Sequence, residues 1–203
     1  VDIASGEREL LTSFPGINGA PTWSPNGKKL ALVLSKSGTP KIYLYNLDNK
    51  SLQQLTYGAA IDTEPSFSEE GKSLFFTSGR GGSPQIYKIT LASKKITRIS
   101  FDGDYNASVA VIPNKKEIAF LHRNGKRFSI AVQNLVNGNV TPLTFSGLDE
   151  SPTVSPNGKL ILYASKKGGR GVLKIVSRDG SLRLILPHSD RNIQEPAWSP
   201  YIS

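Results

Sequence analysis

The sequence contains no cysteine, no methionine and only two histidines. Without cysteine the chain can form neither a disulfide nor a cysteine-ligated zinc site. No apolar run approaches the roughly 18 residues of a membrane-spanning helix, and no basic amphipathic helix is evident, so we predict no direct membrane insertion. Because the chain starts at Val1 without a signal peptide, we interpret it as processed or as a fragment.

Acidic residues are also scarce: the chain has 16 aspartates and glutamates against 25 lysines and arginines, which gives a net charge of +9. This excess raises the question of nucleic-acid binding. No dense basic run with interleaved aromatic residues appears, however, and lysines spread over turns would keep an all-β surface soluble. We therefore predict no nucleic-acid partner, an expectation that a steep salt dependence of binding to random DNA would overturn.

What the sequence does contain is a repeat. The segment PTWSPNGKKLAL at Pro21 returns, with changes, at Pro65, Val109 and Pro152, and in part at Pro196. One slot of this repeat recurs at intervals of 44, 44, 43 and 44 residues, and it is occupied by Pro25, Glu69, Pro113, Pro156 and Pro200. A period of this length is typical of β-propeller blades, provided that each copy holds four short strands.

The first copy meets that condition. Its residues 20–24 are predicted to form a short strand that ends at Pro25, which cannot donate a ladder hydrogen bond. Alternating apolar and polar residues then predict strands at 28–35, 41–47 and 52–56, separated by turn-forming residues. No segment shows a helical period. The sequence therefore predicts an all-β propeller of four-stranded blades.

The period also predicts the blade boundaries, with four full blades at residues 17–58, 61–101, 104–146 and 148–188. Residues 1–14 are interpreted as the outer strands of a truncated blade, and residues 194–203 as the inner strand of the closing blade. One slot of the innermost strands is expected to pack between blades, and it holds Trp23, Phe67, Val111, Val154 and Trp198.

Few residues are suited to catalysis. His122 lies on a predicted strand and His188 in a connecting loop, and neither belongs to a metal-ligand pattern. No G-x-S-x-G segment or phosphate-binding loop occurs, and the glycine-rich stretches at 78–84 and 166–171 fall where hairpin turns are expected. We predict that the chain is not an enzyme.

The loops between blades are expected to surround one mouth of the central channel, and acidic residues gather there: Asp62, Glu64, Asp104, Asp149, Glu150 and Glu195. Two interpretations stay open. The carboxylates either cap turns, or they bind a cation or the basic groups of a partner. Calcium is the candidate ion, near Asp62, Glu64, Asp149 and Glu150, and no other cofactor is predicted.

Longer stretches resemble the C-terminal β-propeller of the TolB family, namely residues 13–48, 62–89, 148–165 and 195–201. The resemblance covers essentially the whole chain. It implies a fragment of a six-bladed propeller, with four full and two partial blades, from which a preceding smaller α/β domain is absent. It further implies a non-catalytic periplasmic protein of the Tol–Pal system of a Gram-negative bacterium, which supports outer-membrane integrity and cell division.

The resemblance also implies partners. These are the lipoprotein Pal and colicin translocation domains at the channel mouth, TolA through the missing N-terminal segment, and calcium in the channel. The family's Pal-contact positions match at Asn18, Ala20, Thr63 and Glu64, and the same rim adds Tyr105, Asn106, Asp149, Glu150 and Glu195. Ile17 stands where the family can carry histidine.

Two alternatives remain, and the weaker one, a sugar- or nucleic-acid-binding propeller, is favoured only by the positive charge. Similar repeats occur in the substrate-gating propellers of prolyl-oligopeptidase-like and tricorn-like serine peptidases, here cut away from the catalytic domain. A peptidase would need a G-x-S-x-G segment downstream of the propeller.

Overall fold

The computed structural model describes residues 2, 5–187, 193 and 195–199. Sixteen strands in this part of the chain form four antiparallel sheets of four strands each, and in every sheet the strands follow chain order. The described residues contain no helix, and hence none that could cross a membrane.

The first sheet contains β1 (Asn18–Trp23), β2 (Lys29–Leu34), β3 (Lys41–Asn46) and β4 (Leu52–Gln54). The second contains β5 (Asp62–Phe67), β6 (Ser73–Gly81), β7 (Ser83–Thr90) and β8 (Ile96–Arg98). The third contains β9 (Tyr105–Ile112), β10 (Glu117–Asn124), β11 (Arg127–Asn134) and β12 (Val140–Pro142). The fourth contains β13 (Glu150–Val154), β14 (Leu160–Lys167), β15 (Arg170–Ser177) and β16 (Arg183–Ile185).

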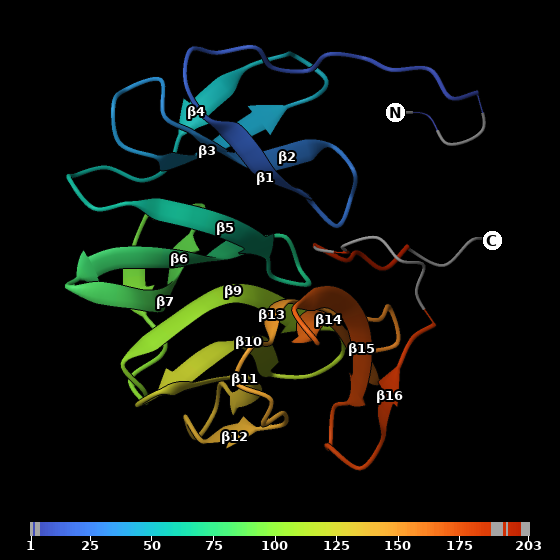
Figure 1. The fold of residues 1–203 in the computed structure, drawn as a ribbon. Coiled ribbons are helices and arrows are strands. Elements are labelled where there is room, and N and C mark those ends of the chain that lie inside the picture. The colour runs from blue at the N-terminus through green and yellow to red at the C-terminus, as the bar shows by residue number, and fades with distance from the viewer. Residues whose placement is uncertain (1, 3–4, 188–192, 194, 200–203) are drawn as a thin grey trace.

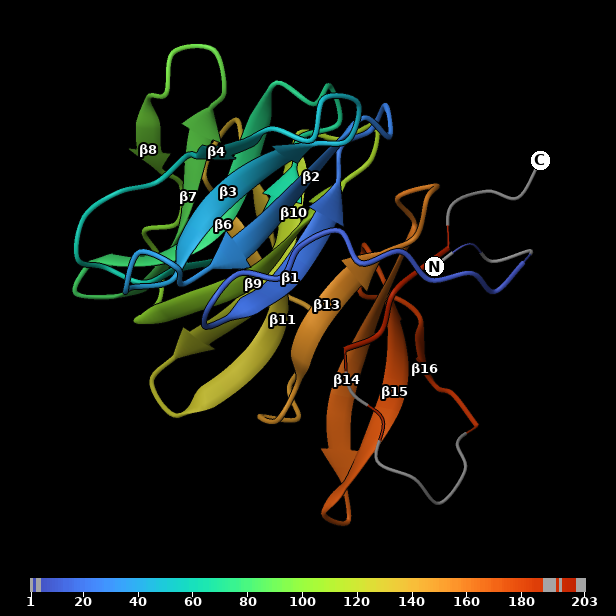
Figure 2. The same ribbon diagram turned by 90° about the horizontal axis from the view of Figure 1, so that it is seen from above.

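The four sheets follow one another around an arc, which runs in Figure 1 from β1–β4 at the top to β13–β16 at the lower right. The innermost strands β1, β5, β9 and β13 contact one another in succession around the centre. Figure 2 shows the same sheets from above, with the described N-terminal residues passing along the open side of the arc. The predicted propeller of four-stranded blades is confirmed.

Apolar side chains fill the space between neighbouring blades, because alternate residues of each strand point to opposite faces of its sheet. The fully buried members at the first interface include Ile42, Leu74 and Phe76. Those at the second include Ile86, Ile118 and Phe120. Those at the third include Ile112, Ile130 and Ile161. The apolar slots of the repeat thus join the blades into one body.

The expectation for the Trp23 slot is wrong at its first copy. Phe67 is 7% exposed because the first blade covers it, whereas Trp23 is 58% exposed. No blade covers Trp23 in the described part of the chain, and it borders an open pocket together with Leu11 and Leu47. Val111, Val154 and Trp198 are half-buried.

The terminal segments also differ from the predicted partial blades. Residues 5–17 and 195–199 form no strand. Leu11 and Phe14 instead pack on the outer face of the first blade, and Trp198 Nε1 donates a hydrogen bond of 3.2 Å to the Thr153 carbonyl in β13. Strands need a hydrogen-bonded neighbour, which these segments do not have among the described residues. The predicted loop position of His188 lies outside the described residues.

Candidate functional site

The centre of the arc is built from a bulge that recurs in every innermost strand. The pairing of β1, β5, β9 and β13 with the next strand shifts register once in each blade. At each shift one non-glycine residue has a positive φ: Ala20 (45°), Glu64 (52°), Ser108 (53°) and Ser151 (51°). Glu195, at the same slot of the fifth repeat, also has a positive φ (51°). A positive φ costs a non-glycine residue about 1 to 2 kcal/mol. Because every repeat has this conformation at the same slot, we interpret the bulge as a conserved part of the blade structure within this chain.

These five residues and the residue after each of them line one cavity of about 280 Å³. Because they come from five successive repeats, this cavity is the mouth of the central channel. Of the predicted contact residues, Ala20, Glu64 and Glu195 lie here. Thr63 and Glu150, which are both half-buried, immediately precede lining residues.

Glu64 joins two blades at this mouth. Its carboxylate accepts hydrogen bonds from Thr77 Oγ1 (2.7 Å), from the Ser108 amide (2.9 Å) and from Ser108 Oγ (2.7 Å). Thr77 belongs to the second blade and Ser108 to the third. The interpretation of the acids as groups that bond backbone amides therefore holds for Glu64, which also faces the channel.

Three of the predicted residues are buried instead of exposed on the rim of the mouth. Asp62 and Asn106 are 0% exposed and Asp149 is 2% exposed. Asp62 forms ion pairs with Lys41 (Nζ to Oδ2, 3.2 Å) and Arg80 (Nη2 to Oδ1, 2.9 Å). The expectation that these residues act as exposed rim groups is wrong, because each one fills the interface between two blades.

Asn106 is held by a chain of hydrogen bonds. Its Nδ2 donates to Gln85 Oε1 (2.7 Å) and to the Asp102 carbonyl (2.8 Å), so its Oδ1 accepts from His122 Nδ1 at 2.8 Å. Burial lowers the pKa of the His122 imidazole below its usual value, against the opposing charges of Asp102 and Asp104. His122 therefore has a structural role, because its hydrogen bond holds Asn106 at the start of β9.

Two further predicted residues stabilise the loops around the mouth. Asn18 Nδ2 donates to the carbonyls of Phe14 (2.7 Å) and Gly16 (3.1 Å). Tyr105 is half-buried, and its ring meets Phe128 edge-on at 5.5 Å between centroids. Burial and the nearby Glu64 charge raise the pKa of the Tyr105 phenol, against the opposing charge of Arg123.

The four acids proposed as calcium ligands do not fit a shared ion. Asp62 is neutralised by two cations, Glu64 is committed to the third blade, and Asp149 is buried beside two serines. In the described part of the chain no three acidic, histidine or cysteine side chains lie close enough together to hold a metal ion.

The sequence reasoning missed a set of exposed apolar residues in the segments that precede the innermost strands. Two slots of the repeat carry them: Ile17, Ile61 and Leu148 (55–56% exposed), and Tyr57, Phe101 and Phe145 (67–71% exposed). We call these six residues the apolar rim. The sequence contains a signal for this rim, because the apolar residues of each slot recur at the period of the repeat. Ile17 was considered only as a departure from the family.

Comparison with known proteins agrees with this geometry. Residues 1–202 match the family described as the TolB beta propeller domain. The chain belongs to the TolB β-propeller family. A TolB from Alcanivorax borkumensis, named a Tol-Pal system protein, is 56% identical over 201 residues, which are 99% of this chain and 46% of that protein.

Solved structures also match the fold of this chain. The crystal structure of TolB from Acinetobacter baumannii matches with a TM-score of 0.93 and 42% identity, over 98% of this chain and 50% of that one. The chain thus spans about half the length of these TolB relatives. A puromycin-hydrolyzing peptidase from Mycobacterium tuberculosis also matches, at 14% identity, with a TM-score of 0.70 and coverage of 87% and 29%, which is a likeness of fold alone.

Proposed function

We propose that this chain is a non-catalytic protein-binding propeller of a Tol–Pal system, which binds the lipoprotein Pal at the channel mouth. The relatives are named Tol-Pal system proteins, which supports this assignment. We further propose a periplasmic location in a Gram-negative bacterium, a contribution to outer-membrane integrity and cell division, and use of the same mouth by colicin translocation domains. Binding of TolA belongs to a segment that precedes the propeller in the family.

The observation that carries the proposal is the composition of the mouth face. Exposed apolar side chains on a soluble protein mark a contact surface when they gather in one place. Six of them lie in the segments that precede the innermost strands, around a channel whose lining includes two acidic residues, Glu64 and Glu195. An apolar rim around a polar centre is suited to a protein partner that inserts a polar segment into the channel.

The decisive experiment is calorimetric titration of the folded chain with the soluble domain of Pal from the same organism. Ile61→Asp places a charge on the apolar rim, and we expect it to weaken binding at least about tenfold, which is roughly 1.4 kcal/mol. Ile61 is 56% exposed, so the substitution leaves the core intact.

Val136→Asp is the matched control. Val136 is 73% exposed and lies between β11 and β12, on the face opposite the loops between blades. It should bind Pal with unchanged affinity. If both variants bind as the wild type does, the mouth face is not the Pal site.

Gating of a serine peptidase is the alternative function, and no observation favours it. The peptidase propellers share the fold at low identity, whereas the TolB relatives match almost the whole chain at 56% identity.

A further inference from the structure

The first two interfaces between blades contain a polar contact between the same two slots of the repeat, but the residues that form it differ. The first residue of β5, Asp62, meets Lys41 from the preceding blade at 3.2 Å. One repeat later Asn106 occupies the slot of Asp62, and Gln85 occupies that of Lys41, with a hydrogen bond of 2.7 Å. In both cases a long side chain from the preceding blade satisfies a buried polar group.

The third interface lacks this long side chain. By the period of the repeat, Asp149 occupies the slot of Asp62 and Asn106, and Ser129 occupies that of Lys41 and Gln85. The pairing of Phe128 with Gly147 confirms that the start of β11 lies beside the loop leading to Asp149. Ser129 is too short to replace the lysine, and its hydroxyl instead faces the His122 carbonyl at 3.5 Å.

The Asp149 carboxylate is therefore only half satisfied. Its Oδ1 accepts hydrogen bonds from Ser146 Oγ and from Ser165 Oγ, the latter at 2.7 Å. Its Oδ2 is buried and has no hydrogen-bond partner among the described residues. A buried carboxylate oxygen without a partner is costly, so it calls for an explanation.

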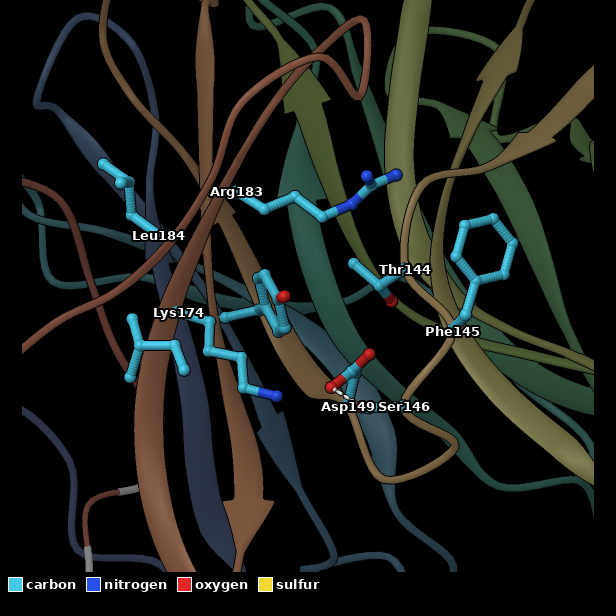
Figure 3. Close-up of a pocket in the computed structure, with 9 residues that line it drawn as sticks. Thr144, Phe145, Ser146, Asp149, Lys174, Arg183 and Leu184 are labelled. Carbon is cyan, nitrogen blue, oxygen red and sulfur yellow. Dashed lines mark hydrogen bonds between the residues drawn. The ribbon is translucent and has the colours of Figure 1, made fainter.

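A pocket of about 470 Å³ lies beside this carboxylate, between the third and fourth blades. Figure 3 shows Lys174 extending from β15 toward Asp149, and the second carboxylate oxygen pointing among the lining residues. Lys174 forms no ion pair within the described chain. Phe145 and Ile185 contribute apolar surface to the same pocket.

We propose that this pocket binds a small zwitterion of the α-amino-acid class. Its ammonium group would bind Asp149 and its carboxylate Lys174, while an apolar side chain would lie against Phe145 and Ile185. The first interface supplies the precedent, because there a primary ammonium, that of Lys41, binds the aspartate in this slot.

Other ligand classes fit less well. A purely cationic ligand would meet the positive charges of Lys174 and Arg183, both of which line the pocket. A metal ion would find the Asp149 carboxylate in the pocket lining, but the described residues contain no group of three acidic, histidine or cysteine side chains that could hold the ion. A zwitterion matches both signs of charge, which is how electrostatic complementarity selects a partner.

The test is titration of the full chain with L-leucine, followed by calorimetry and by amide chemical shifts of the fourth blade. We expect a Kd of about 1 mM or tighter. N-acetyl-leucine lacks the ammonium and 3-methylbutylamine lacks the carboxylate, so each should bind at least about tenfold more weakly.

Substitutions then locate the site. Asp149→Asn removes the charge and should fold, since asparagine occupies the same slot at position 106, yet it should lose at least about tenfold in leucine affinity. Ser129→Lys restores the side chain of the first interface and should exclude leucine by supplying the ammonium within the chain. Lys174→Gln should weaken binding, whereas Lys159→Gln, at an exposed turn outside the pocket, should not.

Two results would overturn the proposal. One is the absence of leucine binding by the folded wild type up to about 10 mM. This result would include the case in which Lys174 pairs with Asp149 in solution and so occupies the ammonium position. The other is equal binding of leucine by wild type and by a folded Asp149→Asn variant. Neither result bears on Pal, whose proposed site is the mouth face.

Discussion

The buried ion pair between Lys41 and Asp62 offers a quantitative test of how the repeat fills its interfaces. The two side chains are 3% and 0% exposed, with 3.2 Å between Nζ and Oδ2. Lys41→Gln would leave the carboxylate with Arg80 alone. Removing one partner of a buried pair typically costs about 3 to 5 kcal/mol, and because Arg80 remains bound at 2.9 Å we expect the lower value, about 3 kcal/mol.

The second interface suggests the compensating change. It carries Gln85 and Asn106 in the slots of Lys41 and Asp62, and it is fully hydrogen-bonded without an ion pair. The double variant Lys41→Gln/Asp62→Asn should therefore recover to within about 1 kcal/mol of the wild type, because a neutral pair can replace a buried ion pair at little cost.

Urea unfolding followed by circular dichroism measures the free energies of the wild type, both single variants and the double variant. The expected coupling between the two positions is at least about 2 kcal/mol. A cost below about 1 kcal/mol for Lys41→Gln, or a double variant whose cost equals the sum of the single costs, would refute the reasoning.

Two further predictions concern stability. Because burial lowers the pKa of folded His122, the unfolded chain takes up a proton near pH 6.5 that the folded chain does not, so the free energy of unfolding should fall as the pH drops below about 6.5. Urea unfolding at pH 7 and pH 5 should show this loss in the wild type and a smaller one in His122→Gln; equal losses would contradict it. Phe67→Ala should cost about 3 kcal/mol, whereas Trp23→Ala, in the same slot but 58% exposed, should cost less than about 1 kcal/mol. Equal costs in thermal unfolding would show that Trp23 is covered in solution.

Much of the fold could be predicted from the period of the sequence alone. A slot within the predicted strands that is apolar in every copy is expected to face a neighbouring blade, and the strands follow from the alternation between turn residues. Trp23 shows the limit of that argument. The slot predicts the direction in which a side chain points, but burial also requires a blade on the other side, and the first copy has none in the described chain.

The candidate site was harder to predict, for a physical reason. A bulge in each innermost strand shifts the register, and a shift of one residue moves a side chain to the other face of the sheet. The bulge occurs at alanine, glutamate and serine, so no glycine marks it in the sequence. As a result Asp62 and Asp149 looked like rim residues, although the structure turns both into the interfaces between blades.

The same comparison of repeats separates what builds the propeller from what gives it specificity. Apolar slots at the interfaces keep their character from blade to blade, since every blade must pack on the next. The mouth has one backbone conformation in five successive repeats but different side chains upon it: Ala20, Glu64, Ser108, Ser151 and Glu195. A repeated backbone that carries unlike groups presents an asymmetric surface, and an asymmetric surface can hold a partner in one orientation. Recognition by this propeller should therefore depend on the positions at which its repeats disagree.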